Sequence, residues 1–220
     1  MKGLLQNKKL LIGLGVVVAG IAVLVLTGTL KFSGSVRKTE PTTVKETKKT
    51  EETQQQQQLS PRAVTFKGVK TGVTMLIKLP LGWVTGKDGR ADLIAGSQTP
   101  EKLDNGQTFT ANMNASVDKH PTGVTSFLDI EKKWKEGLLN QYPSMEIVAD
   151  SSKKINGLDV YVLEVKNTRP DGIVVRQIQY VFYLDDTYMA TVTGSVPDLV
   201  WDKYRGVIKD SMESLERVVE

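Results

Sequence analysis

The sequence predicts an α+β protein in which an antiparallel β-sheet is flanked by helices on both faces and is preceded by one transmembrane helix. The transmembrane helix is indicated by residues 10–30, which are largely apolar and carry no charge. The sheet is indicated by four strand-like segments between residues 145 and 195, which follow one another with turn signals between them. Two of these segments are apolar on both faces, so we expect covering layers on both sides of the sheet.

The apolar segment, residues 10–30, follows a short basic tail, residues 1–9. It is long enough to cross a bilayer as a helix, which takes about 20 residues. A secretory signal peptide has a shorter apolar core of about 7–15 residues, and Thr27-Gly28-Thr29 is a poor cleavage site. We therefore expect an uncleaved single-pass signal-anchor, with a cleaved signal peptide as the alternative. The chain has no cysteine, which excludes a lipid-modified cysteine as the anchor. The side chains expected to contact lipid include Leu10, Val17, Ile21 and Leu26.

The orientation of this segment is indicated by its flanks. Both are basic, with Lys8 and Lys9 before the segment and Lys31, Arg37 and Lys38 after it, so the positive-inside rule does not separate them by itself. The short tail and the lysines that directly adjoin the apolar residues favour a cytoplasmic N-terminus. We expect the rest of the chain to lie outside the cytoplasm, attached to the cell membrane.

Residues 31–62 are predicted to be a disordered polar linker, because Thr, Lys, Glu and Gln dominate and few apolar groups are present to offset the entropy of ordering. Residues 1–62 contain ten Lys or Arg and four Asp or Glu, and the whole chain carries +4, so residues 63–220 carry a net −2. The basic character therefore belongs to the anchor and linker. We expect no nucleic-acid partner, because a nucleic-acid-binding domain carries the basic residues itself. A basic segment beside a membrane suits anionic lipid or cell-wall polymer.

Residues 63–220 have the size of one globular domain. The sheet is predicted to begin with residues 75–80. Residues 108–117 alternate strictly and form the clearest strand, with Phe109, Ala111, Met113, Ala115 and Val117 on one face. The other face should be solvated or line a polar groove, and it carries Thr108, Thr110, Asn112, Asn114 and Ser116.

A helix is predicted to begin after Ser126, which has Asp129 three residues further on, close to a capping box. Its apolar stripe is Phe127, Ile130, Trp134 and Leu138, and Pro143 should end it. A second helix is predicted to begin at Asp198. Its buried stripe should comprise Val200, Tyr204, Val207, Ile208, Ser211 and Leu215.

Between these helices the sequence predicts an antiparallel meander of residues 145–155, 158–166, 173–184 and 187–195. The turns are Asn156-Gly157, which is a strong hairpin signal, then residues 169–172, then Asp185-Asp186. Residues 160–163 and 180–183 are apolar on both faces of their strands.

The order of these elements and several short motifs resemble the PsbP-like fold family, which includes photosystem II extrinsic PsbP proteins and bacterial DcrB-like envelope proteins. The resemblance covers residues 64–218 and is carried by Lys78-Leu-Pro-Leu-Gly-Trp83, Ala111-Asn112, Ser126-Phe127-Leu128, Tyr180-x-Phe182 and Asp210-Ser211-Met212. It implies a PsbP-like sandwich, a sheet between helices, with non-enzymatic binding or assembly work. DcrB-like proteins usually attach through a lipidated cysteine, which this chain lacks. The basic and metal-contacting residues of plant PsbP have no counterparts that we can place here.

Catalytic and metal chemistry have few candidates. His120 is the single histidine, and a catalytic triad would need it with a partner such as Ser126, but no nucleophile elbow is present. Without cysteine, the usual zinc and iron ligands are missing, and we expect no metal and no other cofactor. Weak candidates for an oxygen-ligand metal site are Asp185 and Asp186, joined by Asp198 and Asp202 if the hairpin tip lies near the helix start. Turns and caps explain these aspartates without a metal.

The best candidate binding surface is the row Asn112, Asn114 and Ser116, although ordinary exposed strand polarity explains it about as well. A second candidate is a charged loop site of Asp88 and Arg90 beside Trp83, for which solvated loop charges and a packed Trp83 are the simpler interpretation. The leading hypothesis is a membrane-tethered extracytoplasmic module of the cell envelope that binds or assembles with an envelope protein or ligand, without catalysis. The alternatives are a small-ligand or lipid carrier with a helix–sheet cleft, and a hydrolase that uses carboxylates.

Overall fold

The computed structural model describes residues 61–86 and 89–219. The basic tail, the anchor and most of the linker fall outside these residues. Within them, no helix is both long and apolar enough to cross a membrane.

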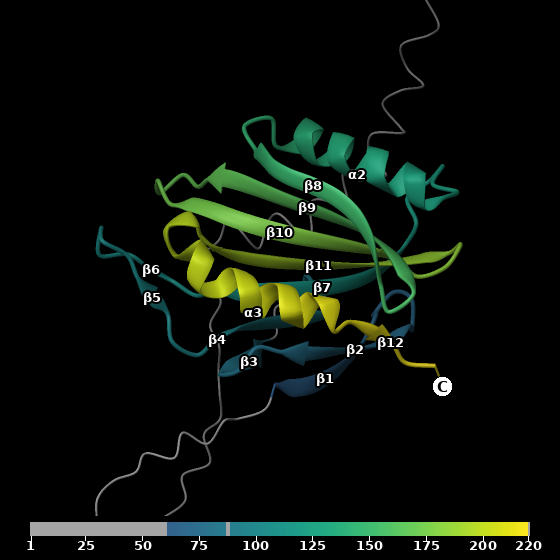
Figure 1. Ribbon diagram of the computed structural model, residues 1–220, viewed down its shortest axis with the longest axis horizontal. Coiled ribbons are helices and arrows are strands. Elements are labelled where there is room, and N and C mark those ends of the chain that lie inside the picture. Colours follow the sequence, from purple (N-terminus) through teal and green to yellow (C-terminus); the bar gives the residue numbers. More distant parts are fainter. Residues whose placement is uncertain (1–60, 87–88, 220) are drawn as a thin grey trace, which may run out of the picture.

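The fold is α+β, with three antiparallel sheets and two α-helices among the described residues (Figure 1). The main sheet has seven strands in the spatial order β3-β4-β7-β11-β10-β9-β8. Their bounds are β3 Trp83–Gly86, β4 Leu93–Ser97, β7 Asn112–Lys119, β8 Glu146–Ile155, β9 Leu158–Thr168, β10 Val174–Tyr183 and β11 Tyr188–Pro197. A three-stranded sheet contains β1 Arg62–Lys67, β2 Thr74–Leu79 and β12 Glu216–Arg217. The hairpin β5–β6 contains β5 Glu101–Lys102 and β6 Thr108–Phe109. The helices are α2 Phe127–Gln141 and α3 Trp201–Glu213, and the 3-10 turn η1 Asp198–Val200 precedes α3.

The predicted meander is confirmed, because β8, β9, β10 and β11 are successive antiparallel neighbours. At the β8–β9 turn Asn156 has φ 51° and Gly157 has φ 82°. Two consecutive residues with positive φ are what a type I′ hairpin turn requires, and Asn-Gly adopts them with little strain. The register of the hairpin therefore follows from this dipeptide.

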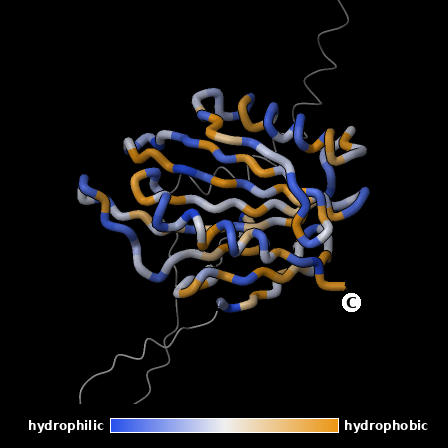
Figure 2. Tube along the Cα trace, viewed as in Figure 1, coloured by the Kyte–Doolittle hydropathy of each residue, from blue (hydrophilic) through white to orange (hydrophobic). Residues whose placement is uncertain are grey.

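Two helices pack on opposite faces of the main sheet, as the doubly apolar strands predict. In Figure 1, α3 crosses the near face, and Figure 2 shows hydrophobic and hydrophilic residues alternating along the helices and central strands. Helix α3 belongs to a large core with Val160 and Val162 of β9 and Tyr180 of β10. Helix α2 belongs to a second core with Tyr161 and Leu163, the intervening residues of β9. Successive side chains of a strand point to opposite faces, so β9, β10 and β11 each contribute to both cores.

The predicted strand over residues 108–117 is interrupted. Strand β6 ends at Phe109 and β7 starts at Asn112. The apolar face from Ala111 to Val117 lies in the large core as predicted. The prediction for Phe109 is wrong: its ring packs with Leu103, Ile173 and Val175 in a separate cluster, because the β5–β6 hairpin bends away from β7.

Helix α2 begins as predicted. Ser126 is the N-cap, and its hydroxyl accepts a hydrogen bond from the Asp129 N–H at 3.3 Å. The Asp129 carboxylate in turn accepts bonds from the Thr125 N–H, the Thr125 hydroxyl and the Ser126 hydroxyl. The Thr125 N–H, followed by these two hydroxyls, lowers the pKa of Asp129 to about 2. The Asp129 carboxylate therefore stays charged, and keeps the hydrogen bonds that it accepts at the start of α2, down to strongly acidic pH.

Helix α3 buries most of the predicted stripe. Tyr204, Ile208, Ser211 and, just after the helix, Leu215 are buried, and Val200 is half-buried. The prediction for Val207 is wrong, because its side chain is 43% exposed, and Trp201 and Met212 are buried in addition. Residues 198–200 form a 3-10 turn, so the α-helix itself begins at Trp201 and not at Asp198. The tertiary partner of Ile208 is Gly194 of β11, where a Cβ would lie 2.5 Å from Ile208 Cγ2.

Candidate functional site

Six amide and hydroxyl side chains form two cross-strand rows on the face of the main sheet that α2 packs against. The register pairs Asn112 with Ser195 and Ser195 with Gln177 in one row. In the other it pairs Asn114 with Thr193 and Thr193 with Gln179. We call this set the polar strip: Asn112, Asn114, Gln177, Gln179, Thr193 and Ser195.

All six residues are buried, with exposed fractions between 0% and 8%. Three hydrogen bonds satisfy some of the donors and acceptors of these side chains. Gln177 Nε2 donates to Ser195 Oγ at 3.0 Å, and Asn112 Nδ2 donates to the Thr110 carbonyl at 2.9 Å. Trp134 of α2 donates its indole N–H to Gln179 Oε1, also at 2.9 Å. The bond from Trp134 fixes α2 against one end of the polar strip.

Two buried atoms of the strip, Asn114 Nδ2 and Thr193 Oγ1, have no hydrogen-bond partner among the residues that the structure describes. Buried polar atoms are nearly always paired, and an unpaired one costs about 1–3 kcal/mol of stability. The two side chains stand opposite one another in the register, so the unmet hydrogen bonds lie at one place on the sheet. An acceptor is needed for the amide, and the hydroxyl can take either role. The strip itself carries no charge, so it is suited to neutral polar groups.

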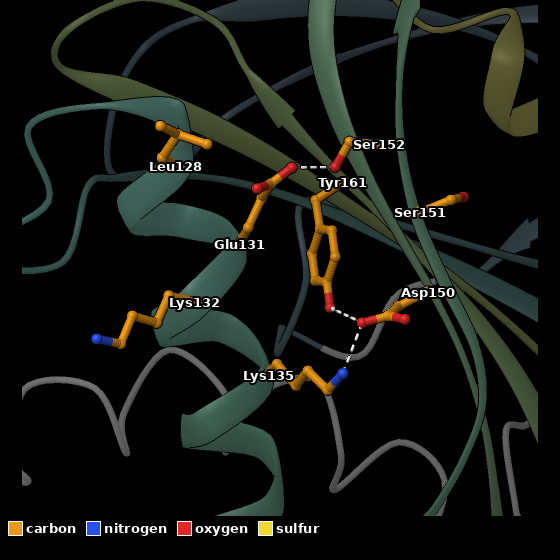
Figure 3. Close-up of a pocket in the computed structure, with 8 residues that line it drawn as sticks. All are labelled: Leu128, Glu131, Lys132, Lys135, Asp150, Ser151, Ser152 and Tyr161. Carbon is orange, nitrogen blue, oxygen red and sulfur yellow. Dashed lines mark hydrogen bonds and ion pairs between the residues drawn. The ribbon is translucent and has the colours of Figure 1, made fainter.

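A pocket of about 420 Å³ lies between α2 and the outermost strand β8 (Figure 3). Lys135 Nζ contacts Asp150 Oδ2 at 2.6 Å, and the Tyr161 hydroxyl donates to the same oxygen at 3.3 Å. Ser152 Oγ donates to Glu131 Oε1 across the pocket. The hydrogen bond from Lys135 lowers the pKa of Asp150, and burial, followed by the nearby Asp150 charge, raises the pKa of Tyr161. The pocket is lined by Leu128, Glu131, Lys132, Lys135, Asp150, Ser151, Ser152 and Tyr161.

Two further pockets lie at other places on the surface. One of about 400 Å³ is mainly apolar and is lined by Leu103, Asp104, Asn105, Ile173, Val174, Pro197, Asp198 and Leu199. The other, of about 450 Å³, is lined by Thr71, Gly72, Val73, Thr74, Tyr188, Arg217, Val218 and Val219. Neither includes a residue of the polar strip.

The structure places the predicted binding residues in different environments. Asn112 and Asn114 belong to the polar strip but are buried, not solvated, and Ser116 is half-buried at its end. Trp83 is 7% exposed and packs in the large core, as the simpler interpretation expects. Arg90 is exposed, and Asp88 lies outside the described residues.

The condition for the four aspartates to converge, a hairpin tip close to the helix start, is not met. Asp185 lies in the turn before β11 and Asp198 lies just after its end, and the ten residues of β11 span about 30 Å. Asp185 is bound to the Thr187 and Tyr188 N–H groups and to Arg217 at 2.6 Å, which suits a turn carboxylate. In residues 61–86 and 89–219, no three His, Cys, Asp or Glu side chains are grouped so that they could hold a metal ion.

His120 and Ser126 do not form the pair that a triad needs. His120 Nε2 donates to the Asp185 carbonyl at 2.6 Å, and its ring lies 4.9 Å from that of Tyr183. His120 Nδ1 is buried and has no hydrogen-bond partner in the described part of the chain, while the Ser126 hydroxyl is hydrogen-bonded to Asp129 in the α2 cap. The hydrogen bonds of both residues therefore stabilise local structure: a turn for His120 and a helix cap for Ser126.

Four members of the polar strip were not predicted from the sequence: Gln177, Gln179, Thr193 and Ser195. A signal was present, because polar residues recur with period two at 177 and 179 and again at 191, 193 and 195. What the sequence lacked was the register that aligns these positions with Asn112 and Asn114.

No protein-family model and no curated protein matches the sequence. Solved structures with the same fold do exist. The solution structure of cyanobacterial PsbP (CyanoP) from Synechocystis sp. PCC 6803 aligns with a TM-score of 0.51 at 13% identity, covering 73% of this chain and 94% of that one. LpqN of Mycobacterium tuberculosis, a protein involved in cell envelope biogenesis, aligns with a TM-score of 0.56 at 13% identity, covering 72% of this chain and 91% of its own. These likenesses show the fold alone: the chain has the PsbP-like fold that the sequence motifs predict.

Proposed function

We propose that this protein is a membrane-tethered, extracytoplasmic binding or assembly module of the cell envelope, and that the polar strip is its binding surface. The observation that carries the proposal is the pair of buried, unpartnered atoms, Asn114 Nδ2 and Thr193 Oγ1. Unmet hydrogen-bonding capacity lowers stability, and such groups are commonly retained where they serve binding.

The ligand chemistry follows from the composition of the strip. Its members are amides and hydroxyls, which donate to and accept from carbonyl and hydroxyl groups. A charged ligand would lack a counter-charge there. The strip therefore fits a neutral group such as a peptide backbone amide or a saccharide hydroxyl.

The tether and its location rest on the sequence. The uncharged residues 10–30 and the basic residues before them support a single-pass anchor with a cytoplasmic N-terminus. The role of LpqN in envelope biogenesis makes the envelope a reasonable setting for a second protein of this fold. A shared fold does not transfer a function, so this likeness only adds to the other arguments.

A non-catalytic role is supported by the surroundings of the candidate catalytic groups. His120 bonds to a backbone carbonyl, and Asp185 bonds to backbone N–H groups and Arg217. These bonds leave neither group with a nucleophile to activate. The carrier alternative expects a permanent cleft beside Asn112, Asn114 and Ser116, and the three pockets described above are lined by none of them. Because the strip residues are buried, binding there requires the side chains that cover them to move aside.

The location can be tested with single-cysteine variants, because the chain has no cysteine. In intact protoplasts, a membrane-impermeant maleimide should label Ser144→Cys, an exposed position after α2. Gln6→Cys, in the N-terminal tail, should be labelled only after the membrane is permeabilised. Protection of Ser144→Cys in intact protoplasts would refute the extracytoplasmic assignment.

The binding role of the polar strip can be tested by substitutions with opposite expected effects on stability. Thr193→Val removes an unpaired buried hydroxyl while keeping the side-chain shape, so we expect the free energy of unfolding to rise by about 1 kcal/mol. Ser195→Ala removes the acceptor of Gln177 Nε2 and should lower it by about 1 kcal/mol.

The functional readout is crosslinking in native membranes from a photoreactive residue at Ser116, beside the strip. We expect a discrete adduct that is lost in Thr193→Val, although that variant is the more stable one. The same photoreactive residue at Arg205, exposed on α3 across the sheet, should give no such adduct. An adduct that persists unchanged in Thr193→Val would argue against the strip as the binding surface.

A further inference from the structure

Strand β8 is the outermost strand of the main sheet, at the opposite end from β3. In the part of the chain that the structure describes, its only strand partner is β9. Four consecutive residues at its middle, 149–152, are exposed on both faces. An outermost strand presents a row of backbone N–H and C=O groups that another strand can pair with.

The part of β8 that is available for regular pairing is sharply bounded. A β-bulge interrupts the register between Ile147 and Ala149, and the Asn156-Gly157 turn follows Ile155. From Ala149 to Ile155 the register with β9 is continuous. The regular segment therefore has seven residues, and its midpoint is Ser152.

The charges of this segment are arranged symmetrically about the same midpoint. Asp150 lies two residues before Ser152 and Lys154 lies two residues after it. All three side chains point to the α2 face, since the register sets them opposite Leu163, Tyr161 and Asp159 of β9. Asp150 and Lys154 keep side-chain exposures of 39% and 68%. An antiparallel copy centred on Ser152 would set each Asp150 opposite a Lys154.

We propose that two copies of this protein pair antiparallel through β8, with Ser152 of each copy on the two-fold axis. The two main sheets then continue into one another, and Asp150 of each copy faces the partner's Lys154. The bulge and the turn limit the paired segment, and the charges select its register. A shift of the centre to residue 150 would oppose two aspartates, and a shift to residue 154 would oppose two lysines, which is unfavourable. A single two-fold axis makes the contact closed, so it yields a dimer and no chain of copies.

Helix α2 leaves room for this pairing. It packs over β9 and the strands beyond it, and across the pocket of about 420 Å³ its side chains contact β8 through Lys135 with Asp150 and Glu131 with Ser152 (Figure 3). A two-fold axis perpendicular to the sheet keeps both α2 helices on the same face, one on each side of the joint. Leu128 of α2 lines the pocket and is 71% exposed, so it is available to pack at that joint.

Cysteine crosslinking of the full chain in its native membrane tests the pairing. Opposed residues of antiparallel strands have Cα atoms about 4.5–5.5 Å apart, within the range that a disulfide spans. Under mild oxidation Ser152→Cys should therefore give a product of twice the chain mass as the major species. Ser144→Cys is a matched control, since two copies of that exposed serine would lie roughly 50 Å apart. Ser152→Ala, tested for protease resistance, shows whether loss of the Ser152 hydroxyl affects the fold.

The outcomes separate the proposal from its alternatives. Crosslinking of Ser152→Cys but not of Ser144→Cys supports the dimer. Equal crosslinking of both, no crosslinking of a folded Ser152→Cys, or a product that contains another protein overturns it.

Charge exchange tests the register. Asp150→Lys in the Ser152→Cys background places lysine opposite the partner's Lys154 and should reduce the crosslinked fraction severalfold. Adding Lys154→Asp places an aspartate opposite the lysine that Asp150→Lys introduces in the partner, and so restores opposite charges between the copies. Within one copy it does not, because Lys154 is the ion-pair partner of Asp159 and the substitution sets a second carboxylate beside Asp159. Recovery of the crosslink in the double exchange supports the register. Failure to recover it in a folded protein overturns the register. The inference does not depend on the polar strip.

Discussion

Ile208→Ala is expected to lower the free energy of unfolding by about 2–5 kcal/mol. Ile208 is fully buried at the contact between α3 and β11, where Gly194 lets the helix approach the strand closely. Truncation removes apolar contacts and leaves a cavity, and the surrounding side chains can close only part of it. Urea unfolding of the full chain in detergent, followed by tryptophan fluorescence, measures the change, because Trp201 lies in the same helix.

Val207→Ala is the matched control. Val207 lies next to Ile208 in the same helix and the sequence stripe predicts that it is buried as well, yet it is 43% exposed. We expect the effect of this substitution to stay below about 1 kcal/mol, because little apolar area returns to water. Equal losses in the two variants would mean that Val207 is buried, as the sequence stripe predicts, and not exposed as observed.

Arg176→Met is expected to lower the free energy of unfolding by about 2–4 kcal/mol. Arg176 Nε donates to Glu164 Oε1 at 2.6 Å, and its guanidinium lies 5.1 Å from the ring centre of Trp201. The Glu164 side chain is only 9% exposed. Methionine keeps much of the packing but leaves a carboxylate in the core without its counter-charge, which costs more than the pair itself contributes. Arg176 also contacts Asp198 of η1 at 3.4 Å, so the substitution should also destabilise this turn, which precedes α3.

The double variant Arg176→Met, Glu164→Gln should recover at least about half of this loss, because the uncompensated charge is gone. Lys70→Met provides the exposed comparison. Lys70 pairs with Asp118 at 3.2 Å but its side chain is 77% exposed, so we expect a change below about 0.5 kcal/mol. A double variant no more stable than Arg176→Met would show that packing on Trp201, and not the buried charge, dominates.

The sequence by itself determined those parts of the fold that depend on near neighbours. Asn156-Gly157 specifies its turn through two positive φ angles, and Ser126 with Asp129 specifies the start of α2. Strands apolar on both faces required a layer on each side of the sheet, and two helices occupy those sides. Strands β1, β3 and β4 were missed, because each is short and none has a long alternating pattern.

Only the tertiary structure decided which distant residues meet. Asn112 and Asn114 were identified from their own strand, but their partners in the polar strip come from β10 and β11 through the register. The physical reason is that periodicity fixes which face a side chain points to, while strand order, register and helix phase depend on packing between segments far apart in the chain.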